Sequence, residues 1–311
     1  MKQIIAIGGG GFGRVIKDLK IETYIKDQCE SENPKICFIP TATGDDKDYI
    51  HNFYKAFDEL GCKTSHINFF KRTIDLRSHI LDQDIIYVGG GNTKSMLAVW
   101  KEWGLDLLLK EAYESGIMMS GVSAGAICWF EKGITDSWAN NQATIDCLGF
   151  VQGICCPHYD EEPERIPYVR DILTNNKIDS CLAIEGYTAL HLINDEQENF
   201  QGPLAGIYSS MKWVLENRKN IEWIFTSPSD TPFLNKNLVN KFLSTNYNSK
   251  TNIILAKSSN KTHPVIGFWH ISLIKSLEEF LAKDNRKIMH WVEGQNYEIL
   301  NFENKNNFFN I

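Results

Sequence analysis

The sequence predicts an α/β protein whose N-terminal part is a doubly wound parallel sheet. Short apolar runs alternate with segments of helical periodicity. This pattern is typical of strands that helices cover on both faces. Glycine-rich loops follow several of the runs, and ligands of such sheets bind at the carboxyl ends of the strands. We therefore expect the functional residues in the loops that follow strands.

The expected elements of the N-terminal part are short strands with helices between them. The strands are 3–8, 35–40, 64–69, 84–88, 117–121 and 181–184. Helices are expected at 46–60 and 105–114, among other places. Right-handed crossovers between such strands produce a doubly wound sheet.

A second part of the chain is expected after Ile193. The stretch 194–202 is polar and ends in a glycine, which a proline follows. The alternation then restarts, with helices at 204–215, 236–243 and 272–282 and strands at 223–227 and 252–256. A length of 311 residues fits two domains of ~100–200 residues each. We place them at residues 1–193 and 194–311.

The amino-acid composition disfavours some classes of binding partner. The formal net charge of −7 disfavours nucleic acid and anionic membranes, since both are bound through basic patches. No apolar run reaches the ~18 residues that a membrane span needs. The eight cysteines lack paired metal-ligand spacing, so we interpret them as reduced thiols of a cytoplasmic protein.

The segment Gly121-Val122-Ser123-Ala124-Gly125 fits the G-x-S-x-G nucleophile elbow. It follows an apolar strand and precedes a helical run, which is the context that the motif requires. The tight turn exposes the serine hydroxyl and needs small neighbours. We predict Ser123 as a nucleophile. The alternative, a serine that only packs in the turn, stays open.

A serine nucleophile needs a base and an orienting acid. His158 follows a short apolar strand, and Pro157 precedes it, so we predict His158 as the base. Glu185, at a strand end, is the expected orienting acid, although a solvated acid would look the same. Asp136 and Asp160 are the other candidates for an accessory role.

The predicted oxyanion hole uses backbone amides. Ala124 follows the nucleophile and supplies one donor, while Gly90 or Gly91 supplies the second because glycine allows a close approach. A further loop, 8–13, is also rich in glycine. No acidic residue closes a second strand where a dinucleotide ribose would need one. We therefore interpret this loop as a close-approach turn that lines the site.

Four blocks in the order 89–93, 121–126, 157–159 and 185–190 resemble peptidase E and its relatives, which include cyanophycinases. The resemblance implies a sheet like that of class I glutamine amidotransferases. It implies Ser123 as nucleophile, His158 as base and Glu185 as orienting acid, and Asp136 matches loosely a further functional aspartate. Peptidase E cleaves dipeptides with N-terminal aspartate, so the implied substrate is a small peptide or related amide, with no cofactor. Arg165 and Arg170 are candidates for binding a substrate carboxylate.

The segments 201–207, 226–233 and 263–269 together resemble molybdenum cofactor guanylyltransferase. This resemblance implies a partial α/β nucleotidyltransferase-like sheet in which Asp230 and Asp195 hold Mg²⁺, with GTP and molybdopterin as partners. Taken alone, Asp230 is also typical of a residue that caps a helix or forms a turn. The N-terminal glycine-rich nucleotide-binding loop of that family does not precede Asp195.

Three hypotheses follow. The first is a serine peptidase that acts through an acyl-enzyme, and the second is a Mg²⁺-dependent nucleotidyltransferase. The third is a non-catalytic fusion with vestigial sites. Association into a homodimer is left open.

Overall fold

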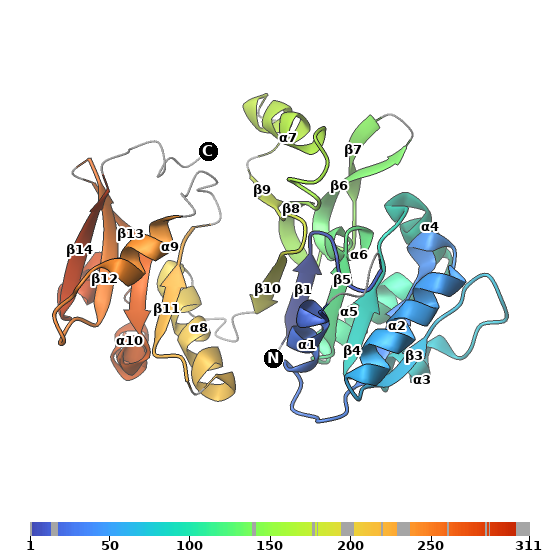
Figure 1. The fold of residues 1–311 in the computed structure, drawn as a ribbon, viewed down its shortest axis with the longest axis horizontal. Coiled ribbons are helices and arrows are strands. Elements are labelled where there is room, and N and C mark those ends of the chain that lie inside the picture. Colours follow the sequence, from blue (N-terminus) through green and yellow to red (C-terminus); the bar gives the residue numbers. More distant parts are fainter. Residues whose placement is uncertain are drawn as a thin grey trace. The chain divides into compact units, whose positions relative to one another are not determined.

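The computed structural model describes residues 2–13, 18–138, 141–175, 178, 180–193, 202–218, 220–228, 237–259, 261–283, 285 and 287–302. The chain divides into two compact units, Met1–Asn194 and Asp195–Ile311. In Figure 1 the first unit is coloured from blue to yellow-green and the second from yellow to red.

A six-stranded sheet forms the centre of the N-terminal unit (Figure 1), in the order β10-β1-β5-β4-β2-β3. Its strands are β1 (Gln3–Ile7), β2 (Lys35–Ile39), β3 (Lys63–His66), β4 (Ile85–Val88), β5 (Met118–Val122) and β10 (Ala189–Ile193). All neighbours are parallel except β10, which runs antiparallel to β1. The prediction of an α/β fold with a parallel sheet is confirmed.

Helices cover both faces of this sheet. They are α1 (Lys20–Lys26), α2 (Lys47–Glu59), α3 (Leu76–Leu81), α4 (Thr93–Trp103), α5 (Leu105–Glu114) and the short α6 (Ala124–Ile127). Successive residues of β1 face opposite cores: Ile5 packs in one core with Phe53 of α2, and Ile4 in the other with Trp100 of α4. Each burial of this kind contributes about 1.5–3 kcal/mol, so the apolar strands are held between two helical layers.

A smaller sheet follows in the same unit, in the order β7-β6-β8-β9. Its strands are β6 (Phe130–Trp138), β7 (Asn141–Asp146), β8 (Val151–Cys156) and β9 (Cys181–Ala183), and α7 (Arg165–Thr174) lies between β8 and β9 in the chain. The expectation that 181–184 belongs to the main sheet is wrong, because β9 pairs with β8. The place beside β1 is taken by β10, which reaches it after a short turn.

The C-terminal unit has a four-stranded sheet in the order β11-β13-β12-β14. Its elements are α8 (Pro203–Asn217), β11 (Trp223–Thr226), α9 (Asn237–Ser244), β12 (Ile253–Ser258), β13 (Lys261–His270), α10 (Ile274–Leu281), α11 (Ile288–Val292) and β14 (Tyr297–Phe302). Only β12 and β14 are parallel, whereas β13 runs antiparallel to both of its neighbours. A core around Met211, Trp269 and Leu277 joins this sheet to α8 and α10.

The cysteines are free thiols throughout the chain. Burial raises the pKa of Cys29 and that of Cys37 to about 12, so both thiols stay protonated at neutral pH. No helix within the described ranges is long and apolar enough to span a bilayer.

Candidate active site

Ser123 lies in a strained turn between β5 and α6. Its φ of 58° and ψ of −112° are rare for a residue with a side chain. The turn leaves no room for larger neighbours: a Cβ on Gly121 would lie 2.4 Å from the carbonyl oxygen of Gly125, and one on Gly125 would lie 2.1 Å from that of Val88. The local geometry is therefore that of a nucleophile elbow.

His158 lies two residues beyond the end of β8 and is 5% exposed. Its backbone is left-handed, with a φ of 51°, and its amide donates to the carbonyl oxygen of Gly8 at 3.0 Å. The ring Nδ1 lies 2.6 Å from Oε2 of Glu161. An ionised carboxylate at that distance holds the proton on Nδ1 and leaves Nε2 as the basic nitrogen.

The acid that contacts His158 is Glu161 rather than the expected Glu185. Glu161 lies three residues after the histidine, in a turn closed by a bond from its own amide to the carbonyl oxygen of His158 at 3.1 Å. The backbone of Glu185 belongs to a different loop, where its carbonyl oxygen accepts from Thr188 Oγ1 at 2.7 Å. The prediction of Glu185 as the partner of Nδ1 is therefore corrected.

The first glycine-rich loop packs against this histidine–glutamate pair. A Cβ on Gly9 would lie 2.5 Å from Glu161 Oε2 and 2.6 Å from His158 Nδ1. On its other side, Glu161 meets Gly186, where a Cβ would lie 2.3 Å from the carboxyl carbon. The interpretation of loop 8–13 as a close-approach turn is confirmed, because side chains at these glycines would displace the carboxylate.

Ser123 and His158 line one cavity of about 340 Å³. The remaining described lining residues are Gly10, Gly13, Thr43, Asp46, Asp48, Tyr49, Asn52, Gly90, Gly91 and Val122. Among the described residues no hydrogen bond joins Ser123 to His158; nucleophile–base contacts are often looser before substrate binds. Asp46 and Asp48 give the cavity negative charge, and its described lining includes no lysine or arginine.

The backbone amides expected to form the oxyanion hole differ in whether they already donate a hydrogen bond. The amide of Gly90 already donates to the hydroxyl of Tyr49 at 3.2 Å. Gly91 has a φ of 136° and lies against Ala42, whose carbonyl oxygen would be 2.4 Å from a Cβ on this glycine. Ala124 is the first residue of α6, so its amide has no acceptor within the helix. The amides of Gly91 and Ala124 thus remain candidates, and that of Gly90 is engaged.

Two acidic side chains near the site accept hydrogen bonds from backbone amides. Glu22 is 2% exposed and accepts from the amide of Phe12 at 2.8 Å; burial raises the pKa of its carboxyl above the usual value. Asp160, predicted as an accessory residue, accepts from the amide of Gly186 at 2.7 Å. It therefore fixes the loop that confines Glu161.

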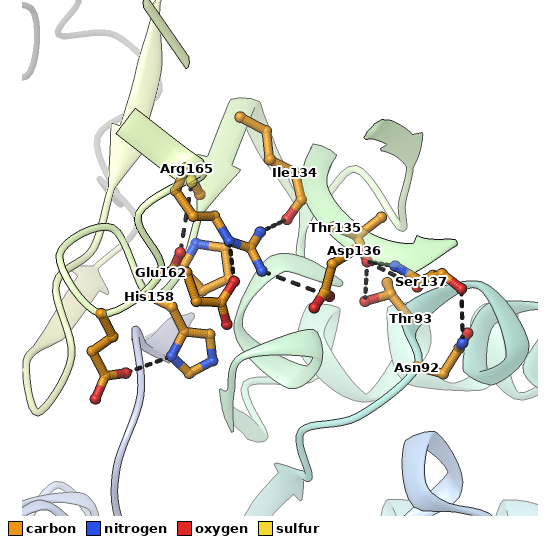
Figure 2. Close-up of polar contacts among 12 residues, drawn as sticks. Asn92, Thr93, Ile134, Thr135, Asp136, Ser137, His158, Glu162 and Arg165 are labelled. Atoms are coloured by element: carbon orange, nitrogen blue, oxygen red, sulfur yellow. Dashed lines mark hydrogen bonds and ion pairs between the residues drawn. The ribbon is translucent and has the colours of Figure 1, made fainter. Parts of the chain in front are cut away.

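Asp136 lies beside Arg165, as Figure 2 shows. The Arg165 guanidinium donates to Glu162 Oε2 at 2.7 Å and to the carbonyl oxygen of Ile134 at 2.8 Å, and Nη2 lies 3.6 Å from Asp136 Oδ1. Arg165 is 2% exposed, so it ties the turn after His158 to β6. This arrangement argues against Arg165 as the receptor of a substrate carboxylate.

The loop after β4 is also anchored to β6. Asn92 caps α4 by accepting from the amide of Ser95 at 2.9 Å, and it donates to the carbonyl oxygen of Ser137 at 3.2 Å (Figure 2). The hydroxyl of Thr135 bonds to that of Thr93 at 3.3 Å. These bonds hold Gly90 and Gly91, which directly precede Asn92, in a fixed loop.

The expected Mg²⁺ ligands, Asp195 and Asp230, lie outside the described residues. Within the described ranges, no three His, Cys, Asp or Glu side chains are grouped as metal ligands would be.

Two residues of the site escaped the sequence analysis. Glu161 stands in the acidic run 160–164, and its spacing of three from His158 was the available signal. Tyr49 is the third residue of α2, and nothing in its neighbourhood along the chain indicates contact with Gly90.

Two family models match the chain. The model of peptidase family S51 matches residues 4–200. That of the MobA-like NTP transferase domain matches residues 167–298.

Individual relatives divide in the same way. The uncharacterized peptidase YgaJ of Bacillus subtilis is 50% identical over 197 residues, which cover 63% of this chain and 85% of that protein. A molybdenum cofactor guanylyltransferase of Nitrobacter hamburgensis is 38% identical over 103 residues, 33% of this chain and 49% of that protein. The chain thus spans about half the length of this transferase. The crystal structure of a peptidase from an acI-B1 actinobacterium has a TM-score of 0.45 at 18% identity, covering 62% of this chain and 83% of that one.

Proposed function

Because the chain belongs to peptidase family S51, we propose that its N-terminal unit is a serine-type peptidase with Ser123, His158 and Glu161 as the catalytic triad. One observation carries the proposal most directly. A strained serine and a buried histidine held by a carboxylate line the same cavity, although they are 35 residues apart in the chain.

The proposed reaction passes through an acyl-enzyme. Ser123 Oγ attacks the carbonyl carbon of the scissile amide while its proton passes to His158 Nε2, and the carbonyl π electrons move to the oxygen. Collapse of this intermediate breaks the C–N bond, and His158 returns the proton to the leaving amine. Water then attacks the ester with His158 as base, which releases the acid and regenerates the serine. Glu161 stabilises the imidazolium that forms twice in this cycle.

The proposed substrate is a short peptide with a free α-ammonium group. A volume of about 340 Å³ lies at the small end of the range of ~300–1,000 Å³ for small-molecule sites. The carboxylates of Asp46 and Asp48 attract a cation at that site. Acetylating the N-terminus of a cleaved dipeptide should therefore raise KM more than it lowers kcat.

Covalent labelling tests the peptidase proposal. A fluorophosphonate probe should modify Ser123, as located by mass spectrometry of peptides, and Ser123→Ala should abolish the modification. Ser95→Ala is the matched control, because Ser95 is an exposed serine on α4. Absence of label on Ser123 in the folded wild-type protein would refute the proposal.

A second candidate function concerns the C-terminal unit. The match to the MobA-like domain and the 38% identity to a guanylyltransferase favour Mg²⁺-dependent transfer of a guanylyl group from GTP to molybdopterin, with Asp195 and Asp230 as the proposed metal ligands. Calorimetry with GTP should then show Mg²⁺-dependent binding that Asp230→Ala removes. If neither labelling nor GTP binding is found, the chain is a non-catalytic fusion.

A further inference from the structure

The side chain of Tyr49 is fixed in place by the two glycine-rich loops of the active site. A Cβ on Gly13 would lie 2.7 Å from its Cε2, and one on Gly89 would lie 2.9 Å from its Cε1. The ring also packs against Phe12 and Phe38, with centroid separations of 5.4 and 5.0 Å. The tyrosine hydroxyl thus has a defined position, as a preorganised donor requires.

The backbone of Tyr49 is fixed as well. It lies in the first turn of α2, where its amide donates to the N-cap carboxylate of Asp46 at 2.8 Å. A capping bond of this kind stabilises a helix end by ~1 kcal/mol. The position of the hydroxyl therefore depends on rigid elements rather than on a free loop.

The Tyr49 hydroxyl has an unused proton. Its oxygen accepts the amide of Gly90 at 3.2 Å, and a phenol carries one donor besides its acceptor capacity. Within the described ranges we find no acceptor for that proton. Burial raises the pKa of Tyr49 to about 12, so the hydroxyl stays protonated at neutral pH. The Gly90 bond polarises it and makes it a stronger donor.

The hydroxyl and the nucleophile both lie against Gly90. Gly90, to which it is bonded, is close enough to Ser123 that a Cβ on this glycine would lie 3.2 Å from the serine Cβ and 3.7 Å from its Oγ. Tyr49 and Ser123 line the same cavity. A carbonyl oxygen attacked by Ser123 therefore develops its charge in the cavity that Tyr49 lines, while one expected donor, the Gly90 amide, is occupied.

We infer that Tyr49 is a catalytic residue whose hydroxyl, together with the amide of Ala124, donates to the oxyanion. The inference rests on the proposed peptidase function and assigns to Tyr49 the second-donor role that was expected of the amide of Gly90 or Gly91. Gly90 then acts by orienting and polarising the tyrosine. The negative charge that forms on the substrate oxygen during attack is stabilised without any proton leaving Tyr49.

The test compares Tyr49→Phe with Tyr54→Phe. Both variants remove a hydroxyl from α2, but that of Tyr54 bonds to Nδ1 of His66 at 2.7 Å and is not part of the cavity. The readout is the rate at which a fluorophosphonate modifies Ser123, because the phosphoryl oxygen occupies the oxyanion position. Tyr49→Phe should slow the maximal modification rate ~100-fold or more, as loss of an oxyanion donor does, with the concentration for half-maximal rate little changed. Tyr54→Phe should stay within about twofold of wild type.

The outcomes separate this inference from the peptidase proposal. If wild type is modified at Ser123 and Tyr49→Phe reacts as fast, the tyrosine role is refuted and the peptidase proposal stands. If Tyr49→Phe weakens only probe binding, its hydroxyl positions ligand, and the inference is likewise refuted. If wild type is not modified at Ser123, both proposals fall. Thermal unfolding of both variants controls for loss of fold.

Discussion

The two units of the chain differ in the way their sheets present loops. In the N-terminal unit, β1, β5 and β4 are parallel neighbours, so the loops after them meet at one edge of the sheet. Those loops carry Gly9, Ser123 and Gly90. In the C-terminal unit, β13 is antiparallel to both neighbours, so it ends at the edge of the sheet opposite to that at which β11 and β12 end. The comparison teaches that the parallel core, more than any single motif, assembles the candidate site.

The largest expected effect concerns the acid of the triad. Glu161→Gln should lower kcat/KM for peptide cleavage by about 10³–10⁴-fold, because an amide no longer stabilises the imidazolium or fixes its tautomer. Glu185→Gln is the matched control and should change kcat/KM by less than about threefold. Steady-state kinetics of both variants decide between the two acids, and the reverse ranking would contradict the geometry around His158.

A smaller effect is expected from crowding the histidine–glutamate pair. Gly9→Ala places a methyl group 2.5 Å from Glu161 Oε2, so the carboxylate must move, and we expect kcat to fall ~100-fold, the size of a mispositioning effect. The same substitution in the other unit is the control. A Cβ on Gly206 of α8 meets no atom within 4 Å, so Gly206→Ala should leave cleavage unchanged and raise helix stability by about 0.5–1 kcal/mol. Equal kinetics of the two variants would contradict the close approach at Gly9.

The buried carboxyl of Glu22 should give the N-terminal unit an unusual pH dependence. Since burial raises its folded-state pKa above the usual value of 4.5, the folded chain holds this proton more tightly than the unfolded chain. Its contribution to the free energy of unfolding is therefore present below pH 4.5 and is lost as pH rises through the folded-state pKa. The test is to measure the free energy of unfolding of wild type and Glu22→Gln by urea denaturation at pH 4.5 and 7.5. Relative to wild type, the variant should be more stable at pH 7.5 than at pH 4.5. A constant difference would contradict the raised pKa.

The smallest effect is expected from Glu298 of the C-terminal unit, with the opposite sign. This carboxylate accepts from the Thr251 hydroxyl and from the amide of Asn248, and these bonds lower its pKa. Its contribution is present above pH 4.5 and is lost as pH falls through the folded-state pKa. The Glu298→Gln variant should be less stable than wild type at pH 5. This difference in the free energy of unfolding should shrink as pH falls from 5 to 3. The change is small, because the group is solvent-accessible, and a deficit that widens on acidification would contradict the assignment.

Much of the N-terminal fold could be predicted because its strands are apolar and its loops carry glycine. Ser123 directly follows β5 and His158 lies two residues beyond β8, so both could be predicted as candidate site residues from the apolar strands before them. Glu161 was missed, because its spacing of three from His158 becomes a contact only through a left-handed turn at the histidine. Tyr49 could not be predicted, because its contact with Gly90 depends on how α2 packs over β2 and β4. The antiparallel edge strand β10 was missed because its partner, β1, lies at the other end of the unit's sequence.

A crystal structure of the chain after reaction with a fluorophosphonate tests the central claim most directly. We predict phosphorus bonded to Ser123 Oγ, with Nε2 of His158 within hydrogen-bonding distance of that oxygen and Nδ1 still bonded to Glu161. A phosphorus atom on another residue, or a His158 ring turned away from Ser123 in the adduct, would contradict the account.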